Sequence, residues 1–449
     1  MINEFLEKNK QNMIDDLTKL VSYNSVYSED ALPFGKTNQA VLAEALGLFE
    51  REGLKTTNLD NYCGFGEVGE GKELIGILAH LDVVPAGEGW SSDPFVVRND
   101  GEYLYGRGVT DDKGPVIASL YALKYLIETK YPFKKRVRLI VGCNEETGSK
   151  CIEHYVEKEG HIDMGFTPDG NFPGIFAEKG VLRGTISATN SKIINIYGGD
   201  AENVVCKKIV VELPVGSYDE STLNEFFRDN NIEYNLIKTD RSITMTVFGK
   251  AAHASTPEQG INAMSYLMEG LYRADFDDEL VTFYHNRIAL THHGELFKAN
   301  QFDDEYTDLT LNVGVISKAQ NVITLTVDVR FPVKAEPEAV KELFMKALNM
   351  GNVRFEISEL AHPLFFDVNI PMIQAMLKAY KDVTGEKDAE MEAIGGGTYA
   401  KAIHNCIAFG CEFPGENCHI HDADESLNIA NFLKQVHIYI EAIKNLNEA

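Results

Sequence analysis

The sequence predicts an α/β protein with two domains, of which the second is inserted into the first. Its 449 residues exceed what one ordinary hydrophobic core holds, so two domains are expected. Continuous apolar runs at 74–79 and 137–142 are typical of strands in a sheet that helices cover on both faces. After residue 182 the order strand, turn, short amphipathic helix and strand occurs twice. We therefore expect one domain from residues 1–182 and 371–449, and an inserted α+β domain of two related halves at 183–370.

Composition excludes several classes of protein. The chain carries 42 Lys and Arg against 68 Asp and Glu, and this net charge of −26 disfavours nucleic acid and anionic membranes as partners. The first residues lack the apolar core of a signal peptide, and no apolar run reaches the roughly 18 residues that cross a bilayer. Seven cysteines without a CxxC pair indicate reduced thiols. We therefore expect a cytoplasmic protein without nucleic-acid or membrane partners.

The first domain begins with two helices and a strand that ends at a candidate site. Spaced apolar residues predict an amphipathic helix at 2–21 and a second helix at about 37–52. The next strand ends at His80, and open α/β sheets bind ligands beyond the carboxyl ends of their strands. Asp82 faces the same way in an extended chain, so it can reach the His80 ring and fix its tautomer. A core histidine beside a solvated aspartate is the alternative for this motif alone.

A turn with two glycines places acidic residues at the start of a helix. Gly106 and Gly108 let the backbone turn sharply, Asp111 and Asp112 follow, and a helix is predicted from Pro115. A carboxylate at this place lies near the positive end of the helix dipole. Simple capping of the helix by either aspartate is the alternative.

Two further acidic segments follow predicted strands. Glu145 and Glu146 come shortly after the strand at 137–142, where adjacent carboxylates repel each other and lose hydration together, so we favour a functional role over a solvated surface pair. Asp169 stands in a Pro-Asp-Gly turn, which alone is weak evidence, and Asp163 competes with it as a candidate. Cys143 is expected to be a small buried residue and not a nucleophile.

The inserted region and the C-terminal part follow. His253 lies in a segment at 249–257 between the two predicted halves. Three glycines at 395–397, followed by Thr398, can cradle a carboxylate or phosphate with backbone N–H groups, although a flexible turn is equally expected. His421 lies in an acidic segment before the last helix, and His419 is its neighbour. The elements predicted for the inserted region are strands at 204–214, 232–237, 243–248, 323–331 and 353–360, and helices at 221–230 and 338–348.

Two imidazoles and three carboxylates form the candidate constellation. They are His80, Asp111, Glu146, Asp169 and His421. Mixed nitrogen and oxygen ligands suit Zn²⁺, with Mn²⁺ or Co²⁺ as alternatives, whereas Mg²⁺ and Ca²⁺ seldom take two histidines. One carboxylate shared between two ions would hold them roughly 3.5–4 Å apart, and an unligated carboxylate could then take a proton from a bridging water. Glu145, beside a liganding Glu146, fits that need.

These motifs, taken in order along the chain, resemble those of the M20 metallopeptidases, and most closely its PepV-type dipeptidases (Xaa-His dipeptidase-like). The segments that carry the resemblance are 80–82, 105–114, 145–146, 168–169, 249–253 and 421–425. The resemblance spans essentially the whole chain. Each motif alone is weak evidence for the family, but six motifs in the same order are specific evidence for it. The resemblance implies a zinc-peptidase-like catalytic domain with a mixed sheet flanked by helices, plus an inserted lid domain.

The resemblance also implies roles for single residues. His80 and Asp169 would bind one zinc ion, Glu146 and His421 the other, and Asp111 would bridge both, giving two Zn²⁺ per chain. The family spacing selects His421 over His419, and the Pro-Asp context selects Asp169 over Asp163. Asp82 would orient His80, Glu145 would be the general base and later the proton donor to the leaving amine, and His253 would stabilise the oxyanion. Substrate contacts would come from Asn203, Arg330, Gly396, Gly397 and Thr398.

The function expected from these features is hydrolysis of the peptide bond of unblocked dipeptides. An N-acyl amino acid amidohydrolase or a carboxypeptidase of the same family is the alternative, and the doubled lid favours the dipeptidase because a closed chamber limits substrate length. A non-catalytic binding protein would have lost a ligand or the base, and no expected position is vacant. The doubled lid also predicts a monomer, in which His253 acts within its own chain.

Overall fold

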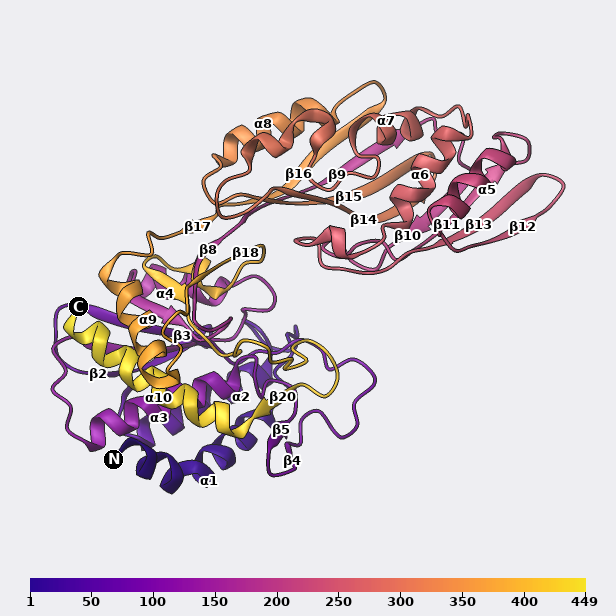
Figure 1. Ribbon diagram of the computed structural model, residues 1–449. Helices are drawn as coiled ribbons and strands as arrows, with labels where there is room; N and C mark the ends of the chain where they lie inside the picture. Colours follow the sequence, from indigo (N-terminus) through magenta and orange to yellow (C-terminus); the bar gives the residue numbers. More distant parts are fainter. The chain divides into compact units, whose positions relative to one another are not determined.

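The computed structural model describes all residues from Met1 to Ala449. The chain folds into two compact units (Figure 1). The first unit contains residues 1–176, 366–392 and 397–449, and the second contains residues 177–365 and 393–396. None of the helices is long and apolar enough to cross a membrane.

A mixed sheet, of which β1, β2, β6, β3, β7 and β19 belong to the first unit, forms the centre of that unit. Its strand order is β1-β2-β6-β3-β7-β19-β8-β17, and β18 pairs with β8. The three strands β6, β3 and β7 run parallel to one another, so their carboxyl ends meet at one edge. The strands are β1 (Lys55–Leu59), β2 (Cys63–Val68), β3 (Leu74–His80), β6 (Arg136–Gly142), β7 (Met164–Thr167), β8 (Ile175–Glu178), β17 (Leu364–Phe365), β18 (Glu392–Ile394) and β19 (Cys406–Ala408).

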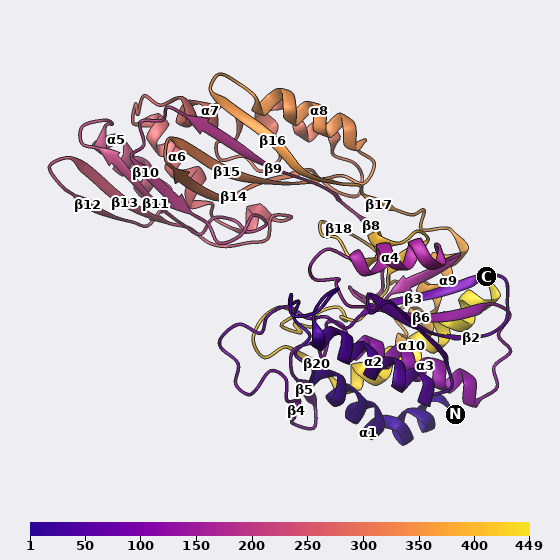
Figure 2. The same cartoon turned by 180° about the vertical axis from the view of Figure 1, so that it is seen from behind.

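Helices cover both faces of this sheet. In both views α4 lies on one face, while α1, α2, α3 and α10 lie on the other (Figures 1 and 2). Glycines on β2 make room for α2, because a Cβ at Gly64 would lie 2.9 Å from Leu46 and one at Gly66 would lie 3.1 Å from Phe49. The helices are α1 (Ile2–Val21), α2 (Lys36–Arg51), α3 (Lys113–Glu128), α4 (Lys150–Glu159), α9 (Pro371–Thr384) and α10 (Ile429–Glu448). A separate small sheet contains β4 (Arg98–Asn99), β5 (Tyr103–Tyr105) and β20 (Ser426–Asn428).

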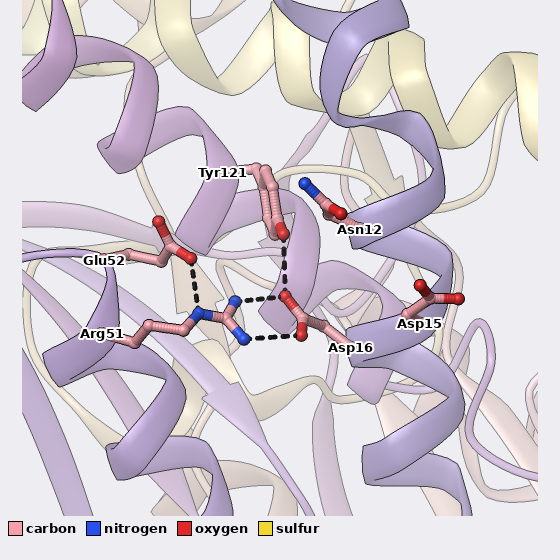
Figure 3. Close-up of a pocket in the computed structure, with 6 residues that line it drawn as sticks. All are labelled: Asn12, Asp15, Asp16, Arg51, Glu52 and Tyr121. Atoms are coloured by element: carbon pink, nitrogen blue, oxygen red, sulfur yellow. Dashed lines mark hydrogen bonds and ion pairs between the residues drawn. The ribbon is translucent and has the colours of Figure 1, made fainter.

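A half-buried ion pair and a tyrosine join three of these helices (Figure 3). Asp16 on α1 accepts hydrogen bonds from both terminal nitrogens of Arg51 on α2, at 2.9 and 2.5 Å. Tyr121 on α3 donates its O–H to the same carboxylate at 2.8 Å. Arg51 also donates its Nε–H to Glu52, which Lys124 contacts from the other side. These groups line a cavity of about 380 Å³ and satisfy one another.

The second unit is an antiparallel sheet with helices on one face. The strand order is β12-β13-β11-β10-β14-β15-β9-β16. Residues from all four helices join one hydrophobic core against the sheet. The order strand, helix, strand occurs twice, in β11-α5-β12 and in β15-α8-β16. The elements are β9 (Gly180–Thr189), β10 (Asn195–Gly198), β11 (Lys208–Pro214), α5 (Glu220–Asp229), β12 (Tyr234–Lys238), β13 (Ser242–Phe248), α6 (Ala263–Arg273), α7 (Glu279–Arg287), β14 (Thr310–Ala319), β15 (Val322–Phe331), α8 (Pro337–Leu348) and β16 (Val353–Ala361).

The predicted fold class is confirmed. The chain is an α/β protein with a mixed sheet flanked by helices and a separate antiparallel sheet in the inserted part. The first helices begin and end within a residue or so of the predicted positions, as do α5, α8 and the strands β13 and β15. The helix expected from Pro115 begins two residues earlier, at Lys113, and neither Asp111 nor Asp112 caps it with a side-chain hydrogen bond.

Candidate metal centre

The carboxyl edge of the parallel strands brings imidazole and carboxylate groups together. His80 ends the fully buried strand β3. Glu145 and Glu146 follow the neighbouring strand β6, and Asp169 follows β7 on the other side. Strands buried on both faces are held in register by their apolar side chains, so the residues that follow them are placed reproducibly.

Asp111 lies between two histidines. Its Oδ1 is 3.0 Å from Nε2 of His80, and its Oδ2 is 2.9 Å from Nε2 of His421. Nε2 of His421 is also 3.4 Å from Oε2 of Glu146. Asp111 is 8% exposed and His80 is fully buried, whereas the His421 side chain is 54% exposed, so the carboxylate offers one oxygen to a buried imidazole and the other to an exposed one. A single carboxylate with this disposition can serve two adjacent cations.

The hydrogen bond at Nδ1 fixes the tautomer of His80. Nδ1 lies 3.0 Å from the backbone carbonyl oxygen of Asp82, which can only accept, so Nδ1 carries the proton and Nε2 is left for a ligand. The carboxylate of Asp82 is farther from Nδ1, at 3.7 Å. Its oxygens accept the backbone N–H groups of Glu145 and Glu146 at 3.0 and 3.1 Å. Asp82 therefore contacts His80 through its main chain and the acidic pair through its side chain.

Two groups of side chains have the geometry to hold a cation. Possible ligand atoms of His80, Asp111 and Glu146 lie within 4.8 Å of one another, and so do those of His80, Glu145 and Asp169. Oε1 of Glu146 is buried without a hydrogen-bond partner, a condition that a bound cation would relieve. The nitrogen and oxygen donors are those that Zn²⁺, Mn²⁺ and Co²⁺ accept. The residues present therefore fit a metal centre.

Electrostatics in the cluster reflect its crowded carboxylates. Burial, followed by the charge of Asp169, raises the pKa of Glu145 well above its usual value. Hydrogen bonds that His421 donates to Asp111 and Glu146 raise its pKa to about 10. Burial opposes ionisation of Asp111, but its bonds to both histidines outweigh that effect and lower its pKa. The crowded carboxylates carry an excess of negative charge, which a divalent cation would neutralise.

The structure separates the candidates that the sequence left open. Asp163 accepts the N–H of Leu74 at 2.7 Å, which places it at the start of β3, away from the end that carries His80. Asp112 accepts the N–H of His80 at 3.0 Å, so its carboxylate supports the backbone, while Asp111 faces the imidazoles. Cys143 is buried and burial raises the pKa of its thiol, which does not suit a nucleophile.

Three predicted residues of the second unit lie near one another. Val204 and His253 form a β-bridge, and the N–H of Ala254 donates to the carbonyl of Asn203 at 2.9 Å. Thr310, the cross-strand partner of Arg330, donates its hydroxyl to the carbonyl of Ala254 at 3.1 Å. These backbone contacts bring Asn203, His253 and Arg330 into one neighbourhood of this unit.

The hydrogen bonds of His253 and Arg330 define what each can offer to a ligand. The N–H of Ser255 points at Nδ1 of His253 at 3.2 Å, so Nδ1 accepts and Nε2 carries the proton. Lost hydration, followed by the charge of Arg330, lowers the pKa of His253, which favours the neutral donor. Arg330 gives two N–H groups to the buried Asp328, at 2.6 and 2.9 Å, which fixes the plane of its guanidinium.

The chain passes from the second unit back to the first within the glycine segment. Gly396 belongs to the second unit and Gly397 to the first. Thr398 accepts the N–H of Ala400 at 3.2 Å and so caps the short 3₁₀ helix at Tyr399–Ala402. A Cβ at Gly395 would lie 2.5 Å from that of Ser255, so the backbone there approaches the His253 segment closely.

Sequence reasoning missed three buried residues around the centre. The ring of Tyr399 meets His80 edge-on, with 6.0 Å between ring centroids, and its O–H contacts Cys151. Glu425 and Arg107 form an ion pair at 2.9 Å that is almost entirely excluded from water. Arg107 and Glu425 lie inside segments that the motifs covered. They differ from ordinary exposed charged residues only in being buried, and a single sequence does not reveal which loop residues are buried.

Mixed nitrogen and oxygen ligands at the edge of such a sheet are typical of metal-dependent hydrolases. The family model described as Peptidase family M20/M25/M40 matches residues 76–445. The chain belongs to this family and is a metallopeptidase, an enzyme that hydrolyses peptide bonds.

Individual relatives agree with this assignment. The chain is 33% identical over 459 residues to the protein named "Putative dipeptidase YtjP" of Bacillus subtilis (strain 168), and the match covers 98% of each chain. The fold is similar to that of human carnosine dipeptidase 1, with a TM-score of 0.60, 17% identity and coverage of 100% and 98% of the two chains. It is also similar to that of the dipeptidase Dug1p of Saccharomyces cerevisiae, with a TM-score of 0.61, 15% identity and the same coverage.

Proposed function

We propose that the protein is a two-metal dipeptidase that cleaves the single peptide bond of unblocked dipeptides. The observation that carries this proposal is the position of Asp111, which offers one oxygen to the imidazole of His80 and the other to that of His421. A carboxylate so placed suits two cations better than one. The dipeptide substrate is proposed because the protein named YtjP, similar over nearly the whole chain, is named a dipeptidase.

The proposed ligands divide around this carboxylate. His80 and Asp169 would hold one ion, Glu146 and His421 would hold the other, and Asp111 would be shared by both. Zn²⁺ is the proposed ion, with Mn²⁺ and Co²⁺ as substitutes. When bound, such ions lower the pKa of a shared water and polarise the scissile carbonyl.

Glu145 is the proposed general base. Its backbone N–H is fixed by the carboxylate of Asp82, which holds its position relative to His80. Burial raises the pKa of Glu145, which makes its carboxylate a stronger base toward a proton of the attacking water. Glu145 takes a proton from the attacking water and returns it to the nitrogen of the leaving amine as the carbon–nitrogen bond breaks.

Residues of the second unit are proposed to bind the substrate. His253 presents a neutral Nε2–H, which suits a donor to the negative charge that develops on the scissile carbonyl oxygen. Asn203 lies beside His253 and is proposed to contact the same group. Arg330 keeps further N–H groups after binding Asp328, and we propose that these recognise a substrate carboxylate. Gly396, Gly397 and Thr398 complete the proposed set of substrate contacts.

Hydrolysis of a matched substrate panel tests the proposal. The panel contains free dipeptides, their N-acetylated forms and the corresponding tripeptides, assayed as purified, after chelation and after Zn²⁺ or Mn²⁺ is restored. Metal-dependent cleavage confined to free dipeptides is expected. Preference for acetylated substrates would assign the protein to the N-acyl amino acid amidohydrolases instead, and failure to cleave any substrate with two ions bound would contradict the proposed reaction. Sedimentation should give a monomer of 50.0 kDa.

A further inference from the structure

Glu425 connects the two segments that carry Asp111 and His421, and the proposed mechanism leaves this residue without a role. It follows His421 in the same loop and directly precedes β20. Its side chain is fully buried, with 0% exposed, although it carries a carboxylate. A buried carboxylate is costly unless its oxygens are hydrogen-bonded. The partners of Glu425 therefore show what its charge accomplishes.

The carboxylate of Glu425 binds the turn that ends at Asp111. Oε1 accepts the backbone N–H groups of Thr110 at 2.9 Å and Asp111 at 3.1 Å. Oε2 accepts the backbone N–H of Gly108 at 2.9 Å and a guanidinium N–H of Arg107 at 2.9 Å. Three of these four donors belong to the main chain, so the carboxylate determines the path of the turn and thereby the position of Asp111.

Arg107 extends this connection toward His421. It is 1% exposed, and its Nη2 donates to the carbonyl oxygen of Asp422, the next residue after His421, at 3.2 Å. Its guanidinium also lies 5.1 Å from the ring centroid of Trp90. The chain that follows His421 is thus held at two points, at Asp422 by Arg107 and at Glu425 by the turn itself.

We propose that Glu425 is a positioning residue for the metal ligands, which with Arg107 holds Asp111 and His421 at binding separation before any ion arrives. This inference rests on the proposed metal centre. Groups behind metal ligands commonly contribute tenfold to a hundredfold in metal affinity because they orient the ligands. A buried ion pair by itself adds little stability, which agrees with a role in geometry.

Glu425→Gln tests the proposal with little change in size. An amide NH₂ would face two N–H donors where an oxygen now accepts both, so the turn must shift. We expect zinc affinity, measured by competition with a chromophoric chelator, to fall about tenfold to a hundredfold. We also expect a changed visible absorption spectrum of the Co²⁺-loaded protein, which reports ligand geometry. The chain has one tryptophan, so altered emission would report movement of Arg107 beside Trp90.

Asp424→Asn is the matched control. Asp424 anchors the same loop by accepting the N–H of Ser91 at 2.9 Å and its hydroxyl at 2.6 Å, but it has no hydrogen bond to the 107–111 turn. Its zinc affinity and Co²⁺ spectrum should equal those of the wild type. If Glu425→Gln fails to fold, Arg107→Lys replaces it, because a lysine keeps the charge beside Glu425 but cannot also bind Asp422; about a tenfold loss of affinity is expected.

The outcomes separate this inference from the function on which it rests. If the wild type binds zinc and Glu425→Gln shows the same zinc affinity and the same Co²⁺ spectrum, the positioning role is overturned. A lower melting temperature of the variant would not change that conclusion. Equal loss of affinity in Asp424→Asn also overturns it, because any loosening of the loop would then suffice. Wild-type protein that binds no zinc, Mn²⁺ or Co²⁺ overturns the proposed metal centre and this inference with it.

Discussion

Asp82→Asn is expected to impair catalysis through the acidic pair and not through His80. The carboxylate, 2% exposed, gives one oxygen to the N–H of Glu145 and the other to that of Glu146. Asparagine keeps the shape but has only one oxygen, so its NH₂ group faces a backbone N–H that it cannot accept. The bond of His80 to residue 82 survives because the main-chain carbonyl makes it.

The magnitude follows from the hydrogen bonds lost. One charge-assisted bond is replaced by a buried, unsatisfied donor, a change that costs on the order of 3 kcal/mol. If the turn at Glu145 moves to avoid this cost, a misplaced base lowers kcat by about a hundredfold, which corresponds to roughly 2.7 kcal/mol. The expected result is therefore a kcat near 1% of the wild type, with KM changed by less than about threefold.

Steady-state hydrolysis of the best dipeptide from the panel measures this effect, with bound metal determined in the same samples. Asp60→Asn is the control, because Asp60 pairs with His154 and Lys158 on the surface of the same unit. A kcat within about threefold of the wild type for Asp82→Asn would show that the Asp82 carboxylate is not needed to position Glu145. Loss of both ions in that variant would instead show that Asp82 acts on the ligands.

Further variants test the base, the oxyanion donor, the helix ion pair and a histidine charge. Glu145→Gln should lower kcat by about a thousandfold with both ions retained, and a rate near the wild type would exclude it as the base. His253→Ala should lower kcat by about a hundredfold, and an effect confined to KM would contradict stabilisation of the oxyanion. Asp16→Ala removes the partner of Arg51 (Figure 3) and should lower the free energy of unfolding in urea by about 2 kcal/mol. The loss is smaller than for a fully buried pair because Arg51 is half-exposed, and a change below about 0.5 kcal/mol would show that the pair is dispensable. Burial lowers the pKa of His437, so near pH 6 the unfolded chain binds more protons at this residue than the folded chain does. The free energy of unfolding should therefore fall as the pH falls through that range. Urea unfolding at pH 5.5 and 7.5 should show a smaller loss for His437→Gln than for the wild type.

The sequence predicted elements best where one face or both faces were clearly apolar. The strand that ends at His80 and the strand at 137–142 are continuous apolar runs, and both occur as expected. Strands β1 and β2 were not predicted because β2 contains glycines at 64 and 66, which leave room for α2 and weaken the strand pattern. Helix α4 was not predicted, because a short and highly charged segment resembles a surface loop.

Chemistry was easier to predict than contact geometry. Residue types and strand ends were enough to select His80, Asp111 and Glu146, which do lie together. The sequence suggested that the Asp82 side chain reaches the His80 ring, but the closest contact comes from its main-chain carbonyl, since the carboxylate is held by the N–H groups after β6. Every residue has a backbone carbonyl, so the residue type at a position does not indicate a contact made by that carbonyl. Glu425 escaped notice for a related reason, because its partners are mostly backbone N–H groups.

Electron paramagnetic resonance of the Mn²⁺-loaded protein tests most directly whether Asp111 bridges two ions. Chelated protein is titrated with Mn²⁺ and its spectrum recorded at each step. We expect uptake of two ions per chain and an exchange-coupled dinuclear spectrum, which Asp111→Ala abolishes. Two ions with the spectrum of isolated Mn²⁺, or a coupled spectrum that persists in Asp111→Ala, would contradict the shared carboxylate and the mechanism built on it.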